Sequence, residues 1–395
     1  MEKHGGVLIA GAGPVGFITA LGLARAGIKV TVIEAEAKIN DSPRAMVYFP
    51  VTLEFLERLG LAGDAHAVGV SNDKLQIRYR ETGDAFVLSP SVLKNDTAYP
   101  YQLHFGQNEL AGLVQTHLLE LPDTEVRFNS RLTAVTQDPD GVTATVKTRN
   151  GQCELRCDWL IGCDGGHSAV RKALKLSFDG HTWPERFVAT NVHYEHFDRY
   201  GLGPANFYIG PDRWAVVAVI DKHRQWRVTY NEDGDIPDEE ALQRIPRRFA
   251  ELFPDMGPYE LLAASPYRVH ERVSGKYRVG RVLLAGDAAH VCNPCGGMGL
   301  TTGLMDAQAL IEALGAVIHG KADDSLLDFY AGERRRVFLE ITTPAATEYK
   351  RLLGEKDPER RRRDRDNLRH VTNHPDIMRQ TMLALFKTRG RPMLQ

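Results

Sequence analysis

An aspartate and three glycines stand close together in the stretch VLLAGDAAHVCNPCGGMGL, residues 282–300. An apolar run at 282–285 ends in Gly286 and Asp287, and a helical pattern begins near residue 300. Glycine has no Cβ, so the glycines before the helix let the backbone approach a ligand, and the helix start offers free N–H groups. Such a site suits an anion or an electron-rich heterocycle, with Asp287 accepting hydrogen bonds from hydroxyls. In isolation, an ordinary strand-to-helix turn also fits this stretch. The glycines are Gly296, Gly297 and Gly299.

A second glycine-rich turn, GAGPVG, lies near the start of the chain. It follows an apolar strand at 7–10 and opens a helix that ends near residue 26, and the next strand ends in Glu34. This context makes the motif a strong dinucleotide site. Gly11 and Gly13 permit the turn and the approach of a pyrophosphate, and Gly16 lets the helix pack on the strand. Glu34 would bind ribose hydroxyls and repel a 2′-phosphate, which favours FAD or NAD over NADP.

A third segment, DWLIGCDGGHSAVR at 158–171, again reads as a strand, a turn and a helix. Its alternative interpretation is a capped helix start, with Ser168 or Asp164 as the cap. All three motifs follow the carboxyl end of an apolar strand. They would converge if one open parallel sheet gathered those ends, because ligands of such sheets bind there.

Strand-like alternation dominates residues 72–104 and 176–276. We therefore expect an α/β protein with a Rossmann-like nucleotide domain, an inserted and mainly antiparallel substrate domain, and a C-terminal helical segment. The nucleotide domain is predicted at 1–71, 105–175 and 277–345, the substrate domain at 72–104 and 176–276, and the helical segment at 346–395. The basic run ERRRRDR at 359–365 is typical of a solvated helix face.

Composition restricts the class of protein. The 395 residues are 43% hydrophobic and 25% charged with a formal net charge of −2, which gives no electrostatic case for nucleic acid. The start of the chain lacks the pattern of a signal peptide, and no integral membrane segment is predicted, so we expect a cytoplasmic protein. The five cysteines suggest no disulfide framework, and Cys292 and Cys295 are expected to line the loop. No metal site is predicted, including at His193 and His196.

The three motifs, in this order, resemble the FAD-dependent aromatic hydroxylases of the para-hydroxybenzoate hydroxylase type. The matching segments are GAGPVG, CDGGHSAVR and GDAAHVCNPCGGMGLTTGLMDA. SPRA at 42–45, which leads to LEFLERLGL, and the helix QNELAGLVQTHL also fit. The resemblance spans roughly residues 5 to 340, is weak in the inserted sheet, and is absent from the tail.

The resemblance implies an FAD site with distinct contacts. The first glycine motif would hold the pyrophosphate, Glu34 the adenosine ribose, and Asp287 the ribityl hydroxyls. The loop after Asp287 would lie against the isoalloxazine. Thr301 departs from the family, which often has asparagine there. The implied residues are Gly11, Gly13, Pro14, Gly16, Glu34, Arg44, Gln107, Asp164, Arg171, Gly286, Asp287, Pro294, Gly296, Gly297, Met298, Gly299, Leu300 and Thr301.

The implied activity is a single-component monooxygenase that uses NADPH or NADH and molecular oxygen. It would hydroxylate a small phenolic or hydroxylated N-heteroaromatic ring through a flavin C4a-hydroperoxide. His104 and Tyr48 are the candidates for a catalytic base, although a structural role fits each as well. Tyr208, Trp214, Trp226 and Tyr230 could line the ring pocket, or could be plain core. Arg213 or Arg227 could hold a substrate carboxylate.

Two alternatives remain open from the sequence. One is a flavin-dependent reductase or halogenase on the same scaffold, although no Trp-x-Trp-x-Ile-Pro segment of the halogenase kind is present. The other is a non-catalytic nucleotide-binding interaction protein, although the intact glycine loop argues against it. A homodimer is the assembly that we expect.

Overall fold

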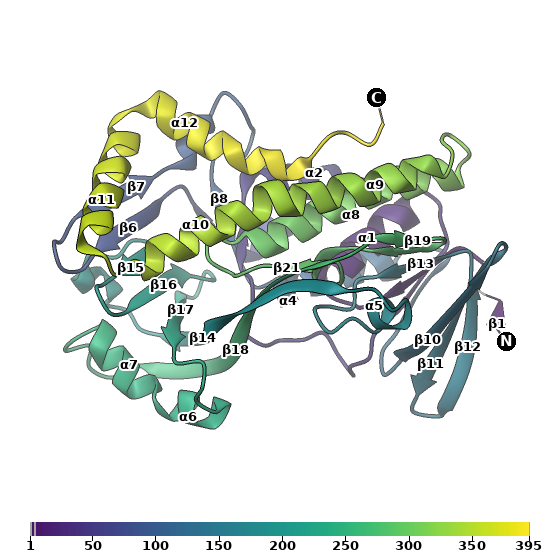
Figure 1. Cartoon of the computed structure of the whole chain (residues 1–395), viewed down its shortest axis with the longest axis horizontal. Coiled ribbons are helices and arrows are strands. Elements are labelled where there is room, and N and C mark those ends of the chain that lie inside the picture. The colour runs from purple at the N-terminus through teal and green to yellow at the C-terminus, as the bar shows by residue number, and fades with distance from the viewer. Residues whose placement is uncertain (1, 4, 395) are drawn as a thin grey trace.

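Two large sheets organise the protein, and the computed structural model describes residues 2–3 and 5–394 (Figure 1). The first sheet has six strands, and its neighbours are parallel except for the first pair. In spatial order the strands are β19 (Arg278–Val279), β20 (Val282–Leu284), β13 (Trp159–Gly162), β2 (Val7–Ala10), β3 (Val30–Ile33) and β9 (Thr124–Arg127). The three strands that precede the motifs are therefore adjacent, which confirms the Rossmann-like prediction.

Helices cover this parallel sheet. Helix α1 (Pro14–Arg25) is buried on all sides from Gly16 to Leu23, as expected for a helix enclosed between a sheet and other helices. It packs against α4 (Gln107–Leu119) and α8 (Met298–Ile318). Helix α9 (Ser325–Val337) follows, and a single π-turn at Phe338–Thr342 joins it to α10 (Thr343–Gly354).

The second sheet has eight strands and is mainly antiparallel; β15 and β6 form its parallel pair. Its length and alternation come from Val-, Trp- and Tyr-rich runs, which suit a pleated surface. The strands, in spatial order, are β21 (His290–Val291), β18 (Glu260–Ser274), β14 (Phe178–His193), β17 (Gln225–Glu232), β16 (Trp214–Val219), β15 (Ala205–Ile209), β6 (Leu75–Tyr79) and β7 (Ala85–Leu88).

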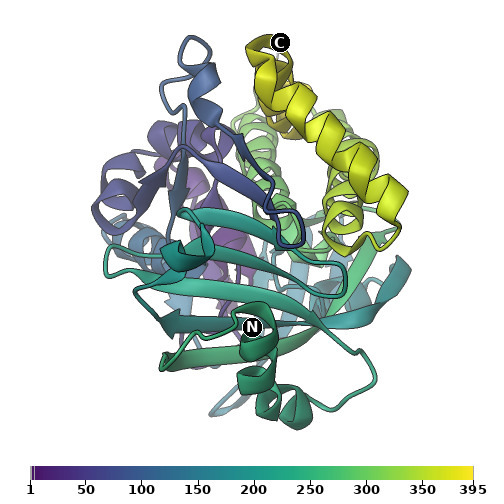
Figure 2. The ribbon, with the colours of Figure 1, turned by 90° about the vertical axis from the view of Figure 1, so that its left-hand side faces the viewer.

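Both faces of the eight-stranded sheet are covered, as Figures 1 and 2 show. One face packs on α6 (Asp238–Gln243) and α7 (Ile245–Leu252), and we call it the α7 face. The other face packs on α10, α11 (Pro358–Asn373), α12 (Pro375–Leu383) and the loop at Cys295, and we call it the loop face. Because side chains alternate along each strand, neighbouring residues belong to opposite faces.

Two smaller sheets complete the fold. A three-stranded sheet of β4 (Val47–Tyr48), β8 (Gln102–His104) and β5 (Val70–Asn72) lies beside α2 (Pro50–Arg58) and α3 (Ala62–Val68). A four-stranded sheet contains β1 (Glu2–Lys3), β12 (Gly151–Cys157), β11 (Gly141–Thr148) and β10 (Arg131–Asp138), and α5 (Ala169–Ala173) packs near it. No motif in the sequence pointed to this four-stranded sheet.

The basic run in α11 corrects one expectation. Arg361 is buried, forms an ion pair with Glu81 and donates to the carbonyl of Gly210 at 3.1 Å. Arg365 lies near Asp84, whereas Arg363 is exposed. One side of the run therefore fastens α11 to the β6–β7 hairpin, and the rest is the solvated face that the pattern predicts. Within the described residues, we find no helix that combines the length and hydropathy needed to cross a membrane.

Candidate active site

The turn between β2 and α1 has room on one side and none on the other. Gly11 has φ +108°, and a Cβ on Gly11 or Gly16 would clash with backbone carbonyl oxygens, of Cys163 and Gly11 respectively. A Cβ on Gly13 would meet nothing within 4 Å. Gly13 caps α1 without any side-chain hydrogen bond, so the first N–H groups of the helix stay available. The turn thus fits an approaching pyrophosphate.

Glu34 follows β3 and its carboxylate is held in place. Oε2 accepts from the backbone N–H of Ala12 at 2.8 Å, and Oε1 accepts from that of Glu36 at 2.9 Å. The bond from Ala12 ties the acid to the glycine turn, and the bond from Glu36 fixes its other oxygen. The geometry suits a carboxylate that accepts from ribose hydroxyls while its own orientation stays fixed.

Asp164 and Arg171 are engaged by protein groups. Asp164 accepts from Ser168 Oγ at 2.5 Å and from two N–H groups at the start of α5, while burial raises its pKa. Arg171 donates to the carbonyls of Ala288 and Gly166, each at 2.7 Å, and stacks over Phe178. Through Ala288, Arg171 connects this segment to the turn that carries Asp287.

A buried ionic group supports the turn at Asp287. Asp306, on α8, accepts from the Gly286 N–H at 3.0 Å, from His290 Nε2 at 2.6 Å and from Arg334 Nε at 2.7 Å. Burial alone would raise the pKa of Asp306, but His290 and Arg334 outweigh it and hold that pKa low. The sequence analysis missed this group, although Asp306 lies in the quoted motif.

Asp287 itself is open to solvent and makes no hydrogen bond to a described side chain. Many protein atoms nevertheless surround the carboxylate, and this desolvation raises the pKa of Asp287, while His290 and Arg44 act in the opposite direction. A carboxylate held out of contact with its own protein is suited to accept hydroxyl hydrogen bonds from a ligand.

The loop after Asp287 approaches two aromatic rings. Gly296 has φ +83° and lies against the ring of Tyr349 on α10, and Gly297 has φ +69° with Phe49 at 3.1 Å from a Cβ position. Helix α8 begins at Met298 with no side-chain cap, so its first N–H groups, near Gly299 and Leu300, stay available, whereas the Gly297 N–H donates to the carbonyl of Pro294 at 3.0 Å. Thr301 is buried and donates to the carbonyl of Gly297 at 3.2 Å, and Pro294 is exposed.

Arg44 and Gln107 reach the same region. The Arg44 side chain is exposed. It lies close enough to Asp287 and Tyr267 to act against the rise in pKa that burial causes in each of them. Gln107 opens α4, and its N–H donates to the carbonyl of Ala45 at 3.1 Å. The segment that carries Arg44 is thereby fixed to the start of α4.

Both candidate bases are fully buried. His104 makes contacts from both ring nitrogens, at 3.0 Å to the carbonyl of Val219 and at 3.2 Å to Gln102 Oε1. Burial lowers the pKa of His104 to about 4, which keeps the ring neutral at physiological pH. Tyr48 stacks on Phe105 with ring centroids 4.1 Å apart, and its hydroxyl has no hydrogen-bond partner among the described residues. Neither assignment as a base has been tested.

The predicted pocket residues divide between the two sheet faces. Trp214 lies on the loop face and packs edge-on against Phe187. Tyr208 and Trp226 lie on the α7 face, stacked on Phe253 and tilted against Phe197 respectively, and Tyr230 joins them. The structure therefore does not bring Tyr208, Trp226 or Tyr230 together with the loop.

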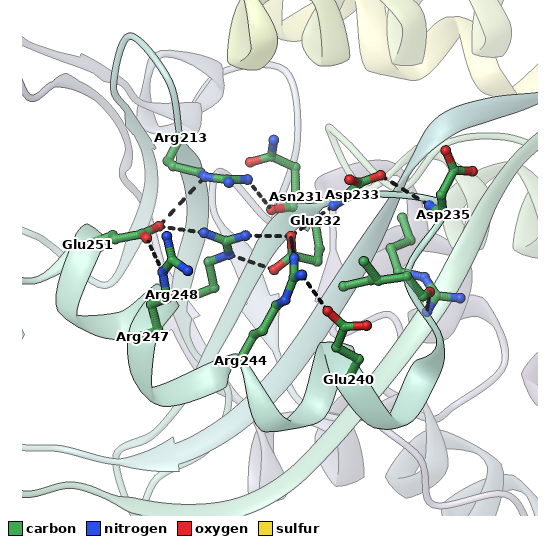
Figure 3. Close-up of polar contacts among 12 residues, drawn as sticks. Arg213, Asn231, Glu232, Asp233, Asp235, Glu240, Arg244, Arg247, Arg248 and Glu251 are labelled. Atoms are coloured by element: carbon green, nitrogen blue, oxygen red, sulfur yellow. Dashed lines mark hydrogen bonds and ion pairs between the residues drawn. The ribbon is translucent and has the colours of Figure 1, made fainter.

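Arg213 belongs to an ionic network beside α7 (Figure 3). Its Nε lies 3.7 Å from Glu251, and Nη1 donates to the carbonyl of Asn231 at 3.4 Å. Arg248 joins Glu251 to the buried Glu232 with distances of 2.6–2.8 Å. The charge of Arg213 is thus neutralised within the protein.

The loop face also carries two polar residues, Arg227 and Tyr267. Arg227 on β17 donates to Asn191 Oδ1 at 2.6 Å and to the carbonyl of Arg44. Tyr267 on β18 lies close to Arg227, Arg44 and Cys295, and burial raises its pKa. No separate signal in the sequence pointed to Tyr267, because a tyrosine in a strand is most often core.

The five cysteines are not paired in the structure. All five are free, and burial raises the pKa of both Cys292 and Cys295. In the part of the chain that the structure describes, no three His, Cys, Asp or Glu residues are grouped so that they could hold a metal ion.

Comparisons with known proteins agree with this geometry. The family model described as "FAD binding domain" matches residues 5–345. Para-nitrophenol 4-monooxygenase of Pseudomonas sp. strain WBC-3 is 44% identical over 100% of this chain and 98% of its own. 6-Hydroxy-3-succinoylpyridine 3-monooxygenase of Pseudomonas putida strain DSM 28022 / S16 is 42% identical over 95% and 96%.

Solved structures extend the comparison. A crystal structure of p-nitrophenol 4-monooxygenase from Pseudomonas putida DLL-E4 has a TM-score of 0.95 and 42% identity, and covers 99% of this chain and 100% of that one. An aklavinone-11 hydroxylase in a ternary complex with FAD and aklavinone has a TM-score of 0.79 and 26% identity, over 89% and 70%. The fold is thus shared with a structure that holds FAD.

Proposed function

The chain belongs to the FAD-dependent aromatic hydroxylases, and we propose that its substrate is a phenol or hydroxypyridine with an electron-withdrawing group para to the ring hydroxyl. Membership makes it a monooxygenase that uses FAD, a reduced nicotinamide and molecular oxygen on an aromatic ring. The reductase, halogenase and non-catalytic alternatives gain no support from these relatives.

One observation carries the substrate class. The two relatives at 44% and 42% identity are named for rings that carry a hydroxyl and a substituent on opposite carbons, and each name places the oxygen on the substituted carbon. These are carbon 4 of para-nitrophenol and carbon 3 of 6-hydroxy-3-succinoylpyridine. An ionised hydroxyl donates electron density to the para carbon, so this chain is proposed to oxygenate that carbon.

The residues around the loop are proposed to hold FAD. The glycine turn of Gly11 to Gly16 would bind the pyrophosphate, Glu34 the ribose, and Asp287 the ribityl hydroxyls. Arg44 and Gln107 would contact the linking chain. FAD, when bound, supplies the reduction by NAD(P)H and the activation of oxygen. The first N–H groups of α8 would stabilise negative charge on the edge of the isoalloxazine ring that faces them.

Oxygenation at a substituted carbon has a chemical consequence. That carbon has no hydrogen to lose, so the ring recovers a conjugated structure only when the substituent leaves with the bonding electron pair. For para-nitrophenol, the substrate, dioxygen, NAD(P)H and a proton would give para-benzoquinone, nitrous acid, NAD(P)⁺ and water. The two electrons from NAD(P)H reduce the second oxygen atom to water. The protein's task is to bind the anion and exclude water.

A substrate series tests this proposal. The FAD-loaded enzyme would be incubated with NADH or NADPH and with para-nitrophenol, meta-nitrophenol or para-nitroanisole. We expect stimulated NAD(P)H oxidation, nitrite release and one labelled oxygen from isotope-labelled dioxygen in the product with para-nitrophenol alone. A product that keeps the nitro group and gains a hydroxyl elsewhere would refute oxygenation at the substituted carbon. Failure of every para-substituted phenol and hydroxypyridine to stimulate oxidation would refute the substrate class.

The same proposal includes cytoplasmic location and a homodimer. Cytoplasmic location is supported by the need for a continuous supply of NAD(P)H. The homodimer is carried only by the expectation from the family. Cell fractionation and light scattering on the FAD-loaded protein would measure the two properties.

A further inference from the structure

We propose that the guanidinium of Arg227, on the loop face of β17, binds the ring oxyanion of the substrate. This inference rests on the proposed function, because it names the residue that anchors that substrate class. It assigns the anion contact to the inserted sheet and leaves the flavin contacts to the parallel sheet.

Arg227 is buried, and its guanidinium is held by two neighbouring segments. Its side chain is on the loop face, and the residue is 7% exposed. Nε donates to Asn191 Oδ1 at 2.6 Å, and Nη1 donates to the carbonyl of Arg44. These two bonds fix the plane of the guanidinium against two neighbouring elements. A planar group held in this way is pre-organised for one further acceptor.

Arg227 differs from the other buried arginines. Four of them form ion pairs with carboxylates, and Arg171 is occupied by two carbonyls and the ring of Phe178. Arg227 forms no ion pair with any carboxylate that the structure describes. A buried cation without a counter-ion is costly, which points to an anion that arrives with the ligand. The four paired residues are Arg186, Arg248, Arg334 and Arg361.

Small side chains surround Arg227 on the same face. In the strand register, Arg227 lies beside Asn191 and Ala218, and Asn191 lies beside Ala263. The next row on this face contains Ser265, Ala189, Thr229 and Val216 in neighbouring strands. Beyond that row, Tyr267 and Phe187 are the first large rings on β18 and β14. The side chains beside Arg227 on this face are therefore short, and the substrate ring is proposed to lie above them, next to the charge.

Charge favours an oxyanion as the occupant. Burial lowers the pKa of Arg227 to about 10, so the guanidinium stays protonated at neutral pH. The ionisable group that faces it is Tyr267, which itself lies near Cys295 and Arg44, and burial keeps the tyrosine and the thiol neutral. The relatives' rings share the hydroxyl and differ in the opposite substituent, so an anchor for the shared group is the ring oxygen.

The test measures ligand ionisation and affinity in the oxidised, FAD-loaded enzyme without NAD(P)H. Para-nitrophenol is titrated across pH, and its phenolate absorption reports the ionisation state of the bound ligand. We expect the wild type to bind the phenolate and to lower the ionisation pH of the bound phenol. Arg227→Gln should weaken binding on the order of a hundredfold and abolish that shift, whereas Arg227→Lys should retain part of both. The exposed Arg247→Gln is the matched control and should behave as wild type.

Two further probes separate the possible failures. Para-nitroanisole has no ionisable oxygen, so Arg227→Gln should not change its affinity. Azide, followed through the flavin absorption, should bind to the wild type and not to Arg227→Gln. If azide binding depends on Arg227 but the wild type ignores para-nitrophenol, the anion site stands and the proposed substrate fails. If the wild type turns over para-nitrophenol and Arg227→Gln binds the phenolate equally well, the inference is overturned and the function stands. If Arg227→Gln loses FAD, the test rests on the wild type and on Arg227→Lys. An ionisation pH of bound para-nitrophenol that is not lowered in either of them then overturns the inference.

Discussion

The two faces of the eight-stranded sheet treat buried charge in opposite ways. On the α7 face, Glu232 is fully buried, and Arg248 meets both of its oxygens at 2.6 and 2.7 Å (Figure 3). Burial alone would raise the pKa of Glu232, but the bonds from Arg248 outweigh it and hold the pKa low. On the loop face, Arg227 meets only an amide oxygen and a carbonyl.

This difference separates charges that stabilise the fold from charges that await a ligand. A charge that is paired inside the protein gains its partner on folding, whereas Arg227, which is buried, and Asp287, which is open to solvent, form no ion pair with any residue that the structure describes. His104 shows a third outcome, because neutral partners surround it and it gives up its charge instead. Among desolvated groups without a counter-ion, only one whose ordinary pKa is far from neutrality keeps its charge.

The largest expected effect on stability comes from breaking the ion pair between Arg248 and Glu232 on the α7 face. Arg248→Met should lower the free energy of unfolding by about 3 kcal/mol or more, because Glu232 is left buried without its bidentate partner. Chemical denaturation monitored by circular dichroism would measure the loss. Combining Arg248→Met with Glu232→Leu should restore most of it, since the uncompensated carboxylate is then gone. Equal losses in the single and double variants would contradict this account of the network.

A somewhat smaller effect is expected from the neutral histidine. The pKa of His104 is about 4 in the folded protein and 6.5 as its ordinary value, so the folded state resists a proton that the unfolded state accepts. Stability should therefore fall as the pH drops from about 6.5 to about 4, by about 3 kcal/mol in total.

His104→Gln should remove this part of the pH dependence, as measured by denaturation at a series of pH values. The same variant tests the catalytic assignment, because loss of a base would lower kcat with little change in KM. A pH dependence unchanged by the substitution would show that His104 is not the group responsible.

Removing a charge that has no partner within the protein should change ligand affinity and not the stability of the protein. Asp287→Ala should weaken FAD binding by about 2 kcal/mol, or roughly thirtyfold, because charge-assisted bonds to hydroxyls are lost. The FAD-free variant should be at least as stable as wild type, since the pKa of Asp287 is raised and its ionised form is penalised by desolvation. FAD titration by fluorescence and denaturation of the apoprotein measure the two quantities. Full FAD affinity in this variant would remove Asp287 from the proposed site.

The smallest effect is expected at the rim of the ionic network. Arg247 is 75% exposed, and its Nε lies 3.0 Å from Glu251. Exposed pairs are worth little, so Arg247→Gln should change stability by no more than about 0.5 kcal/mol. Thermal unfolding at low and high salt would detect a larger contribution. A change comparable to that of Arg248→Met would show that burial does not decide which charges matter here.

The sequence was sufficient for the fold because the motifs carry their own context. Gly11, Glu34 and Asp287 each follow an apolar strand, and strands of that kind gather in one parallel sheet. The face of the inserted sheet was harder to predict. Period-two alternation separates Arg227 from Trp226, but both faces are covered, so hydrophobicity does not reveal which face meets the loop.

Side-chain groups that join distant segments could not be predicted from the sequence either. Asp306, His290 and Arg334 form one buried group although they lie on different elements. Nothing local distinguishes Arg334 from the neighbouring arginines at 335 and 336. Burial makes the difference, and burial is decided by tertiary packing. The assignments of the FAD and substrate residues remain predictions for the experiments above.

The strand order of the parallel sheet affects how the protein folds during its synthesis on the ribosome. β2 is synthesised early but lies between β3 and β13, and β13 in turn pairs with β20, far later in the chain. Strands that are this far apart in the sequence pair slowly, so apolar strand edges stay unpaired and exposed during synthesis. The proposed FAD contacts, drawn from residues 11 to 301, would exist only once these strands have joined. Cofactor supply should therefore not assist early folding; it should instead protect finished molecules from turnover in the cell.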